Sequence, residues 1–483
     1  MLTLYNIAAF DWITIGMGNS PKSLFYPAVD MDVKAKHPVI LVPGLLSSKL
    51  ESWSVVKNTC EKYPGEFFRA SIYSKISGVA KWIFSGPCVL DIADLDPEEG
   101  RDSPKGYKVR PGAGFQSIDY FAGGSPIFAK IIGNLGAIGY DPGNMAVVSY
   151  DWRLSFEMME SRDYTLSRMK MEIELLVRKN KEKAVIMAHS LGGLMTHYFI
   201  HWVTNIDPEW MNTYIHAWIP NSAPFLGSPE SVLSVTTGYV KDASLDSRVN
   251  ADARQKMRSH IRSYYSMFPM GGNRVWGNGT FNPALKDQNT LVNGQLFTLS
   301  GTDSTIITAD KVTGPLLSKL HPALQDHAAS FNYKATDPID TTDKKSWINP
   351  LASKLPNGTY TVYCSYGIGS PTVYSFAIKD NGNRFDWDKK DSFGYHNGAA
   401  TVNGDATVTL TSLGYPCHST WKSKRNNPYS VPIITKEYPG RTHGGILQDI
   451  EFLSDLLMIA SGHEIEQVIH SNITAIAAQI DRQ

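Results

Sequence analysis

The 483-residue sequence has no excess of charge of either sign, since Lys plus Arg and Asp plus Glu both number 46. Proteins that bind nucleic acid usually present a basic field, so this balance argues against a nucleic-acid partner. Charged residues make up 19% of the chain and hydrophobic residues 42%, proportions that exclude a disordered chain. The length suits one large catalytic core that carries insertions.

Cysteine is scarce, with four residues at positions 60, 88, 364 and 417. The sequence contains no CxxC pair and no Cys/His cluster with the spacing of zinc ligands, so we expect no metal site. Four cysteines allow three pairings. Spacing alone does not choose among these pairings, or between disulfides and free thiols.

Long hydrophobic runs are also missing. No run of 18 or more apolar residues occurs, so we expect no conventional membrane span. Residues 1–18 are apolar, but they lack a basic start and are interrupted by Asp11, which makes a poor signal peptide. Three N-glycosylation sequons begin at Asn278, Asn357 and Asn472, a number that chance could supply. These features alone leave the cellular compartment undecided.

The sequence does contain a regular alternation of strand and helix patterns. An apolar run closed by Pro-Gly at residues 37–44 predicts a buried parallel strand that enters a tight loop. Residues 146–150 and 184–188 predict two more buried strands. Helical spacing of apolar residues marks 166–177 and 191–203. This order of elements predicts βαβ units and a parallel sheet.

The alternation stops at about residue 229 and resumes at 360–364 and 373–378, where strand patterns return. Gly, Asn, Ser and Lys are frequent in between, which favours an inserted cap over an independent domain. We therefore expect four parts: an N-terminal segment 1–36, a core 37–228 with a lid insertion at 52–100, a cap 229–355, and the C-terminal part of the core 356–483.

The sequence Ala-His-Ser-Leu-Gly-Gly at 188–193 lies between a predicted strand and a predicted helix. A serine on such a sharp turn exposes its Oγ, and small neighbours let the turn close. Ala188 stands where the common G-x-S-x-G pattern has its first Gly. The alternative is a chance helix cap, but the flanking strand and helix favour Ser190 as a nucleophile. The pattern predicts an α/β-hydrolase fold, a mostly parallel sheet with helices on both faces and with lid and cap insertions.

A nucleophilic serine needs backbone N–H donors for the oxyanion that develops on the substrate. The helix after Ser190 directs its free N–H groups and its positive end toward that oxygen. The loop after the first strand supplies a second donor in this fold. We expect the two donors to be the N–H groups of Leu46 and Leu191. Their side chains can also be ordinary core residues, because the donor is the backbone.

The other two catalytic groups should follow in the order acid, then histidine. Asp405 lies in a tight Asn-Gly-Asp loop late in the chain, where a carboxylate can reach a histidine. His443 lies in a loop just before an amphipathic C-terminal helix, as suits a base that serves two partners. His396 and His418 are the main alternative bases, and both come earlier in less loop-like surroundings.

With these residues in place, the chain resembles the lecithin–cholesterol acyltransferase superfamily, and most closely its phospholipid:diacylglycerol acyltransferase branch. The resemblance runs from about residue 37 to the C-terminal helix. It rests on the segments HPVILVPGLLSSKLE (37–51), SYDWRLSFE (149–157), RDYTLSRMKMEIELL (162–176), AHSLGG (188–193), PFLGSPE (224–230), YCSYGIGSPT (363–372), NGDATV (403–408) and THGGILQDIEFL (442–453).

The resemblance implies that Ser190 is the nucleophile, Asp405 the acid and His443 the base, with Leu46 and Leu191 at the oxyanion positions. No metal and no diffusible cofactor is implied.

It also implies two disulfides, Cys60–Cys88 closing the lid loop and Cys364–Cys417 near the acid. Disulfides place the catalytic domain in an oxidising compartment. We therefore expect the endoplasmic reticulum or another secretory-pathway compartment, with the enzyme associated with a membrane surface on the lumenal side. The lid at 61–87 carries aromatic residues that suit contact with lipid, namely Tyr63, Phe67, Phe68, Tyr73, Trp82 and Phe84.

The sequence departs from the family pattern in two ways. The branch usually begins with a membrane-spanning helix, and none is evident here. The family tends to place a Trp in the lid near Tyr73. Neither departure touches the three catalytic positions.

The expected reaction takes an acyl chain from a glycerophospholipid through acyl-Ser190 to diacylglycerol, giving triacylglycerol and lysophospholipid. A phospholipase A that uses water as the acceptor would share the triad, as would a sterol O-acyltransferase. A catalytically silent lipid-binding protein is a remote alternative, against which the intact triad argues. Arg153 could contact the lipid phosphate or form a structural ion pair, and we favour the ion pair.

Overall fold

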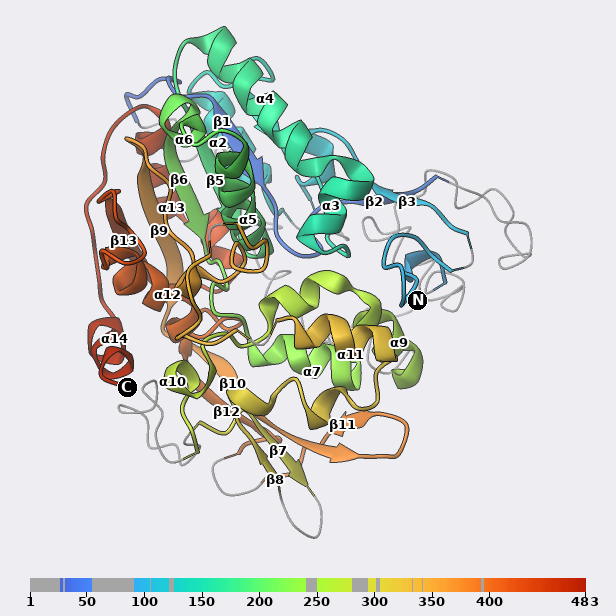
Figure 1. The fold of residues 1–483 in the computed structure, drawn as a ribbon. Coiled ribbons are helices and arrows are strands. Elements are labelled where there is room, and N and C mark those ends of the chain that lie inside the picture. Colours follow the sequence, from blue (N-terminus) through green and yellow to red (C-terminus); the bar gives the residue numbers. More distant parts are fainter. Residues whose placement is uncertain are drawn as a thin grey trace, which may run out of the picture.

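The structure, a computed structural model, describes most of the chain (Figure 1). The described residues are 27–28, 31–53, 91–104, 106–120, 126–239, 250–279, 294–300, 305–331, 333–340, 342–391 and 395–483. Most of the predicted lid, including Cys60, Cys88 and Tyr73, lies outside them.

Six strands form a central sheet in the order β13-β9-β6-β5-β1-β4, and every neighbouring pair is parallel. The strands are β1 (Val39–Val42), β4 (Met145–Val147), β5 (Ala184–His189), β6 (Ile215–Asn221), β9 (Thr361–Ile368) and β13 (Ile433–Pro439). β1 and β5 are buried along their whole length, as expected for strands covered on both faces. The parallel strands predicted near residues 40, 147 and 186 are confirmed.

Helices cover both faces of this sheet (Figure 1). α4 (Thr165–Asn180), α5 (Leu191–Ile206) and α12 (Leu410–His418) pack into the core on one face. α2 (Ala129–Ala137) and α13 (Ile450–Ala460) pack into a second core on the other face. α5 is buried on almost all sides, whereas α4 buries one stripe. The sheet with its two helical layers confirms the α/β-hydrolase fold.

A second, smaller sheet is built mainly from antiparallel pairs. Its strands are β7 (Phe297–Ser300), β8 (Thr305–Ile307), β10 (Ser370–Asp380), β11 (Phe385–Trp387) and β12 (Ala399–Gly404). β10 pairs with β7 in parallel and with β12 in antiparallel orientation. The sheet therefore joins strands from the predicted cap 229–355 to strands from the predicted C-terminal part 356–483. The division of the chain into domains stays a prediction.

The remaining helices and strands connect and cover these two sheets. They are β2 (Leu50–Ser52), β3 (Val109–Pro111), α3 (Phe156–Asp163), α6 (Trp210–Tyr214), α7 (Pro229–Thr237), α9 (Ala251–His260), α10 (Gly272–Trp276), α11 (Pro322–Ala329) and α14 (Ile473–Asp481). Figure 1 shows α7, α9 and α11 gathered beside the second sheet. Among the described residues, no helix is both long enough and apolar enough to cross a bilayer.

Candidate active site

Ser190 occupies a sharp turn between β5 and α5, at the carboxyl edge of the central sheet. Its φ of 57° and ψ of −126° are strained for a residue that carries a side chain. The turn is held by the Ser190 N–H, which donates to the carbonyl oxygen of Asn221 at 2.9 Å. A Cβ on Gly192 would overlap the carbonyl oxygen of Pro43, and one on Gly193 would overlap the Cβ of Ala223. These contacts explain why two glycines follow the Ser-Leu pair.

His443 lies between Ser190 and Asp405. Its Nε2 is 2.8 Å from the Oγ of Ser190, and its Nδ1 is 2.7 Å from Oδ2 of Asp405. A carboxylate only accepts hydrogen bonds, so Nδ1 is the donor and the bare Nε2 of the neutral ring accepts the serine proton. Asp405 is completely buried, and Ser190 and His443 are each 9% exposed. This arrangement can deprotonate the serine hydroxyl.

The carboxylate of Asp405 is oriented by its own loop, which follows β12. Its Oδ1 accepts the N–H groups of Thr407 at 3.1 Å and Val408 at 2.7 Å, which leaves Oδ2 for His443. Ala406 has a left-handed φ of 72°, and its N–H donates to Oγ1 of Thr372 at 2.9 Å. Asn403 and Gly404 belong to β12, so the turn predicted at Asn-Gly-Asp begins only at Asp405. The two N–H donors fix the orientation of the Asp405 carboxylate.

The loop after β1 lies directly against Ser190. A Cβ built on Gly44 would be 2.8 Å from the Cβ of Ser190. Tyr150 fixes the loop by donating its hydroxyl to the carbonyl oxygen of Pro43 at 2.6 Å. Leu46 has a φ of 62°, and neither its N–H nor that of Leu191 has an acceptor within the described part of the chain. Two free donors beside the nucleophile suit a substrate oxygen, and their oxyanion role stays a prediction.

One residue of the site, His189, is not predicted by the sequence. Its ring Nε2 bonds to the backbone carbonyl oxygen of His443 at 2.8 Å. Its Nδ1 is buried and has no hydrogen-bond partner among the residues that the structure describes. Burial, and secondarily the nearby His443, lower the pKa of His189 to about 3. The only sign in the sequence is a histidine next to the serine, and a backbone partner 254 residues away leaves no local pattern.

The two alternative bases are not brought to Ser190. His396 is almost fully exposed and faces Asp391 at 3.5 Å. His418 ends α12, and its Nδ1 is buried without a partner among the described atoms. Of the three candidate bases, only His443 bonds to the serine.

Arg153 does not face Ser190 as a free cation. Its side chain is 1% exposed, and its Nη2 lies 2.6 Å from Oδ2 of Asp151. Its Nη1 donates to the carbonyl oxygen of Ala93 at 2.8 Å. Arg162 bonds to the same Asp151 oxygen at 2.7 Å. The pair of arginines holds the pKa of Asp151 far below its usual range although burial opposes this. The structural ion pair expected for Arg153 is confirmed.

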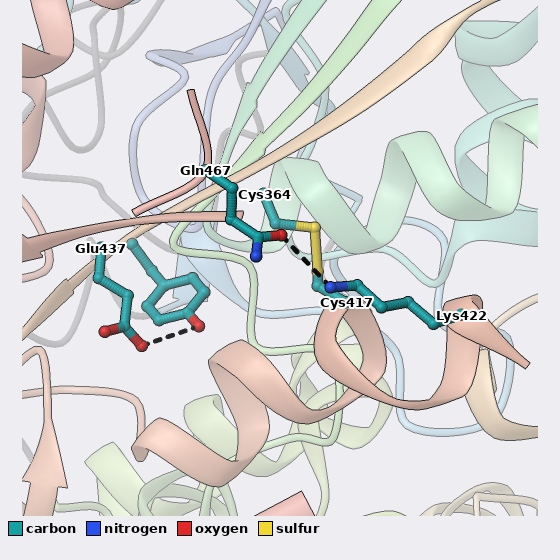
Figure 2. The surroundings of a disulfide bond; sticks show 6 residues. Cys364, Cys417, Lys422, Glu437 and Gln467 are labelled. Atoms are coloured by element: carbon teal, nitrogen blue, oxygen red, sulfur yellow. Dashed lines mark hydrogen bonds between the residues drawn. A yellow bond between two sulfur atoms is a disulfide. The ribbon is translucent and has the colours of Figure 1, made fainter. Parts of the chain in front are cut away.

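A disulfide joins Cys364 on β9 to Cys417 on α12 (Figure 2). Figure 2 shows the hydrogen bond from Lys422 to Gln467 beside it. Tyr366, two residues after Cys364 in β9, donates to Oε1 of Glu437 at 3.2 Å. This pairing is the one implied by the family resemblance. α12 begins at Leu410, soon after the Asp405 loop, so the disulfide fixes the helix that follows the acid to the central sheet.

Comparison with known proteins extends the likeness to most of the chain. The family model described as lecithin:cholesterol acyltransferase matches residues 67–454. A phospholipid:diacylglycerol acyltransferase of Schizosaccharomyces pombe is 31% identical, over 89% of this chain and 73% of its own. The phospholipid:diacylglycerol acyltransferase 1 of Arabidopsis thaliana is 28% identical, over 93% of this chain and 84% of its own. A lysosomal phospholipase A and acyltransferase of Mus musculus is 25% identical, over 91% of this chain and 93% of its own.

The matched residues include the serine turn, the acid loop and the histidine loop, and the sheet around them has the α/β-hydrolase arrangement. By its sequence, this chain belongs to the lecithin:cholesterol acyltransferase family.

Proposed function

We propose that this enzyme is a phospholipid:diacylglycerol acyltransferase that works through an acyl-Ser190 intermediate. The observation that carries the chemistry is the line of hydrogen bonds from Ser190 through His443 to Asp405, at 2.8 and 2.7 Å. The names of the fungal and plant relatives support the donor and the acceptor.

In the first half-reaction, the Oγ of Ser190 attacks an ester carbonyl carbon of a glycerophospholipid, and Nε2 of His443 takes the hydroxyl proton. The N–H groups of Leu46 and Leu191 stabilise the oxyanion of the tetrahedral intermediate. As the ester C–O bond breaks, His443 returns the proton to the departing glycerol oxygen. Lysophospholipid leaves, and the acyl chain stays on Ser190 as an ester.

In the second half-reaction, diacylglycerol takes the place of lysophospholipid. His443 removes the proton of its free hydroxyl, and the resulting oxygen nucleophile attacks the acyl-serine carbonyl. Collapse of the intermediate returns the proton to Ser190 and releases triacylglycerol. Asp405 keeps the Nδ1–H tautomer of His443 and stabilises the imidazolium in both halves.

The proposed setting is the lumenal surface of a membrane in the endoplasmic reticulum or another secretory-pathway compartment. The disulfide between Cys364 and Cys417 supports an oxidising compartment, because cytosolic thiols are kept reduced. Both substrates are lipids, so the enzyme must work at a membrane surface.

The test is to supply vesicles of acyl-labelled phosphatidylcholine and unlabelled diacylglycerol and to follow the label. We expect labelled triacylglycerol, and we expect Ser190→Ala to lower its formation by about 10⁴-fold or more. Ser461→Ala is a matched control, since this serine hydroxyl is buried without a described partner and lies far along the chain, just after α13.

Label found only in free fatty acid would make the enzyme a phospholipase A, the activity that the mouse relative's name includes. Label that moves to sterol, when sterol is added, would make it a sterol acyltransferase. Triacylglycerol formation that persists in Ser190→Ala would refute the acyl-serine mechanism.

A further inference from the structure

We propose that His189 is a positioning residue. Its hydrogen bond to the backbone carbonyl of His443 holds the imidazole of His443 in line with Ser190. The inference rests on the proposed function and deepens it. It adds a fourth side chain to the site, which acts through His443 and does not touch the substrate.

The backbone of His443 is bonded on both sides. Its N–H donates to the carbonyl oxygen of Asp405 at 2.7 Å, and its carbonyl oxygen accepts from Nε2 of His189 at 2.8 Å. The first bond ties the histidine loop to the acid loop, and the second ties it to the strand that carries the nucleophile. His189 is the residue immediately before Ser190. Its hydrogen bond to the His443 carbonyl therefore directly sets the distance between the imidazole of His443 and the hydroxyl of Ser190.

The hydrogen bond also fixes the protonation state of His189. A carbonyl oxygen only accepts, so Nε2 carries the proton and Nδ1 of the neutral ring is bare. A second proton on Nδ1 would be buried without an acceptor, in a ring whose centre is 4.9 Å from that of His443. The low pKa given above agrees with this. His189 therefore stays a neutral donor while His443 takes up and returns the proton of Ser190.

The hydrogen bond from His189 to His443 matters because catalysis requires the reacting groups to be placed accurately. A misplacement of about 1 Å between reacting groups costs roughly 100-fold in rate. Without His189, the bonds from His443 to Asp405 remain, and the two loops can shift together relative to Ser190. The binding of the lipid chains would not change, so the loss should appear in kcat and leave KM almost unchanged.

The chain supplies a matched control at the opposite edge of the sheet. His37 lies before β1, is buried, donates from Nδ1 to the carbonyl oxygen of Lys183 at 2.8 Å, and has an unpartnered Nε2 among the described atoms. Burial also lowers the pKa of His37. His37 therefore resembles His189 as a buried ring that donates to one carbonyl oxygen, and it has no catalytic neighbour. It differs in that Oε2 of Glu182 also lies 3.7 Å from its Nδ1.

The experiment compares His189→Ala, His189→Gln, His189→Asn and His37→Ala in the full chain. A fluorophosphonate end-point titration counts the serine sites that are folded, and kcat and KM are measured per titrated site with phosphatidylcholine–diacylglycerol vesicles. We expect His189→Ala to lower kcat about 10- to 100-fold with KM changed less than about twofold. His37→Ala should lower the melting temperature and keep kcat per site within about twofold.

The amide variants keep the test decisive if His189→Ala does not fold. The amide nitrogen of glutamine lies two bonds beyond Cγ, as Nε2 of histidine does, whereas that of asparagine lies one bond beyond. We expect His189→Gln to regain most of kcat and His189→Asn to stay low. A normal kcat per site in His189→Ala, or equal kcat in the two amide variants, would overturn the inference. If Ser190→Ala is inactive, either of these results overturns the role of His189 and leaves the proposed function standing. If Ser190→Ala is active, the proposed function and the role of His189 are both refuted.

Discussion

Gly44 shows how tightly single residues are packed around the nucleophile. A Cβ at this position would lie 2.8 Å from the Cβ of Ser190 and 3.2 Å from the carbonyl oxygen of His189. Neither neighbour can rotate away, because one is a backbone atom and the other is a Cβ. We expect Gly44→Ala to push the loop that carries Leu46 away from Ser190 and to lower kcat about 100-fold. Steady-state kinetics with labelled phosphatidylcholine and diacylglycerol measure this loss.

The control for Gly44 is Gly136 near the end of α2, where an added Cβ meets no atom within 4 Å. Gly136→Ala should leave kcat unchanged and raise the free energy of unfolding by about 0.5 kcal/mol, because alanine favours the helix. Wild-type kcat in Gly44→Ala would contradict the close packing of the loop against the serine.

At the residue scale, the sequence predicted the groups whose chemistry has a local pattern. Ser190 was recognisable from the strand, the helix and the small residues around it, and Asp405 and His443 from their loops and their order. His189 was not recognisable, because its partner is the backbone carbonyl of His443 and any residue type supplies that group. The same holds for Gly44, since what it must avoid is the Cβ of Ser190.

At the scale of elements, the Cys364–Cys417 disulfide links β9 to the helix that follows the acid loop. We expect the double variant Cys364→Ala/Cys417→Ala to lose about 2–4 kcal/mol of unfolding free energy, since the cross-link closes a long loop with a sequence separation of 53. Its kcat should fall as well, because α12 is no longer tied to the sheet. Denaturant unfolding and kcat measure the two effects, and an unchanged unfolding midpoint would contradict the first.

The elements themselves were predicted unequally well. The strand at 184–188 and the helix at 191–203 appear with shifts of only a few residues, since buried runs and helical spacing are local properties. The strand pattern at 373–378 is also a strand, β10, but it pairs with β7 and β12 in the second sheet. Alternation of side chains predicts a strand and carries no information on which sheet accepts it, so this pairing was not predictable.

At the scale of the whole molecule, the catalytic residues lie at the edge of the central sheet where the strands end, and the Asn357 sequon lies at the opposite edge. Ser190 follows the carboxyl end of β5, and His443 follows that of β13. Asn357 precedes β9 at the opposite edge, and the eight residues of β9 separate the two edges by about 25 Å. In the proposed setting, the membrane would meet the edge that holds Ser190, and the edge near Asn357 would face water.

The proposed lumenal location predicts a glycan at Asn357. Asn357 and Thr359 are exposed in a bend, and Oγ1 of Thr359 accepts from Nζ of Lys183 at 3.0 Å. No hydrogen bond from the described residues engages the side chain of Asn357, whereas Asn278 and Asn472 both interact with other residues. A bulky hydrophilic glycan fits the edge that faces water.

We expect peptide-N-glycosidase to convert Asn357 to Asp in the full chain made by a eukaryotic host, and mass spectrometry detects this conversion. Asn357→Gln and Thr359→Ala should lose the glycan, and Thr359→Ser should keep it. Asn381→Gln is the control for the substitution itself, because Asn381-Gly-Asn383 is exposed and lacks the sequon. The side chain of Asn381 differs from that of Asn357 in being hydrogen-bonded to Asp386. Occupancy at Asn278 or Asn472 alone would contradict the choice of Asn357, and a chain without any glycan would contradict the lumenal location, since the acceptor in the bend is open to the transferase.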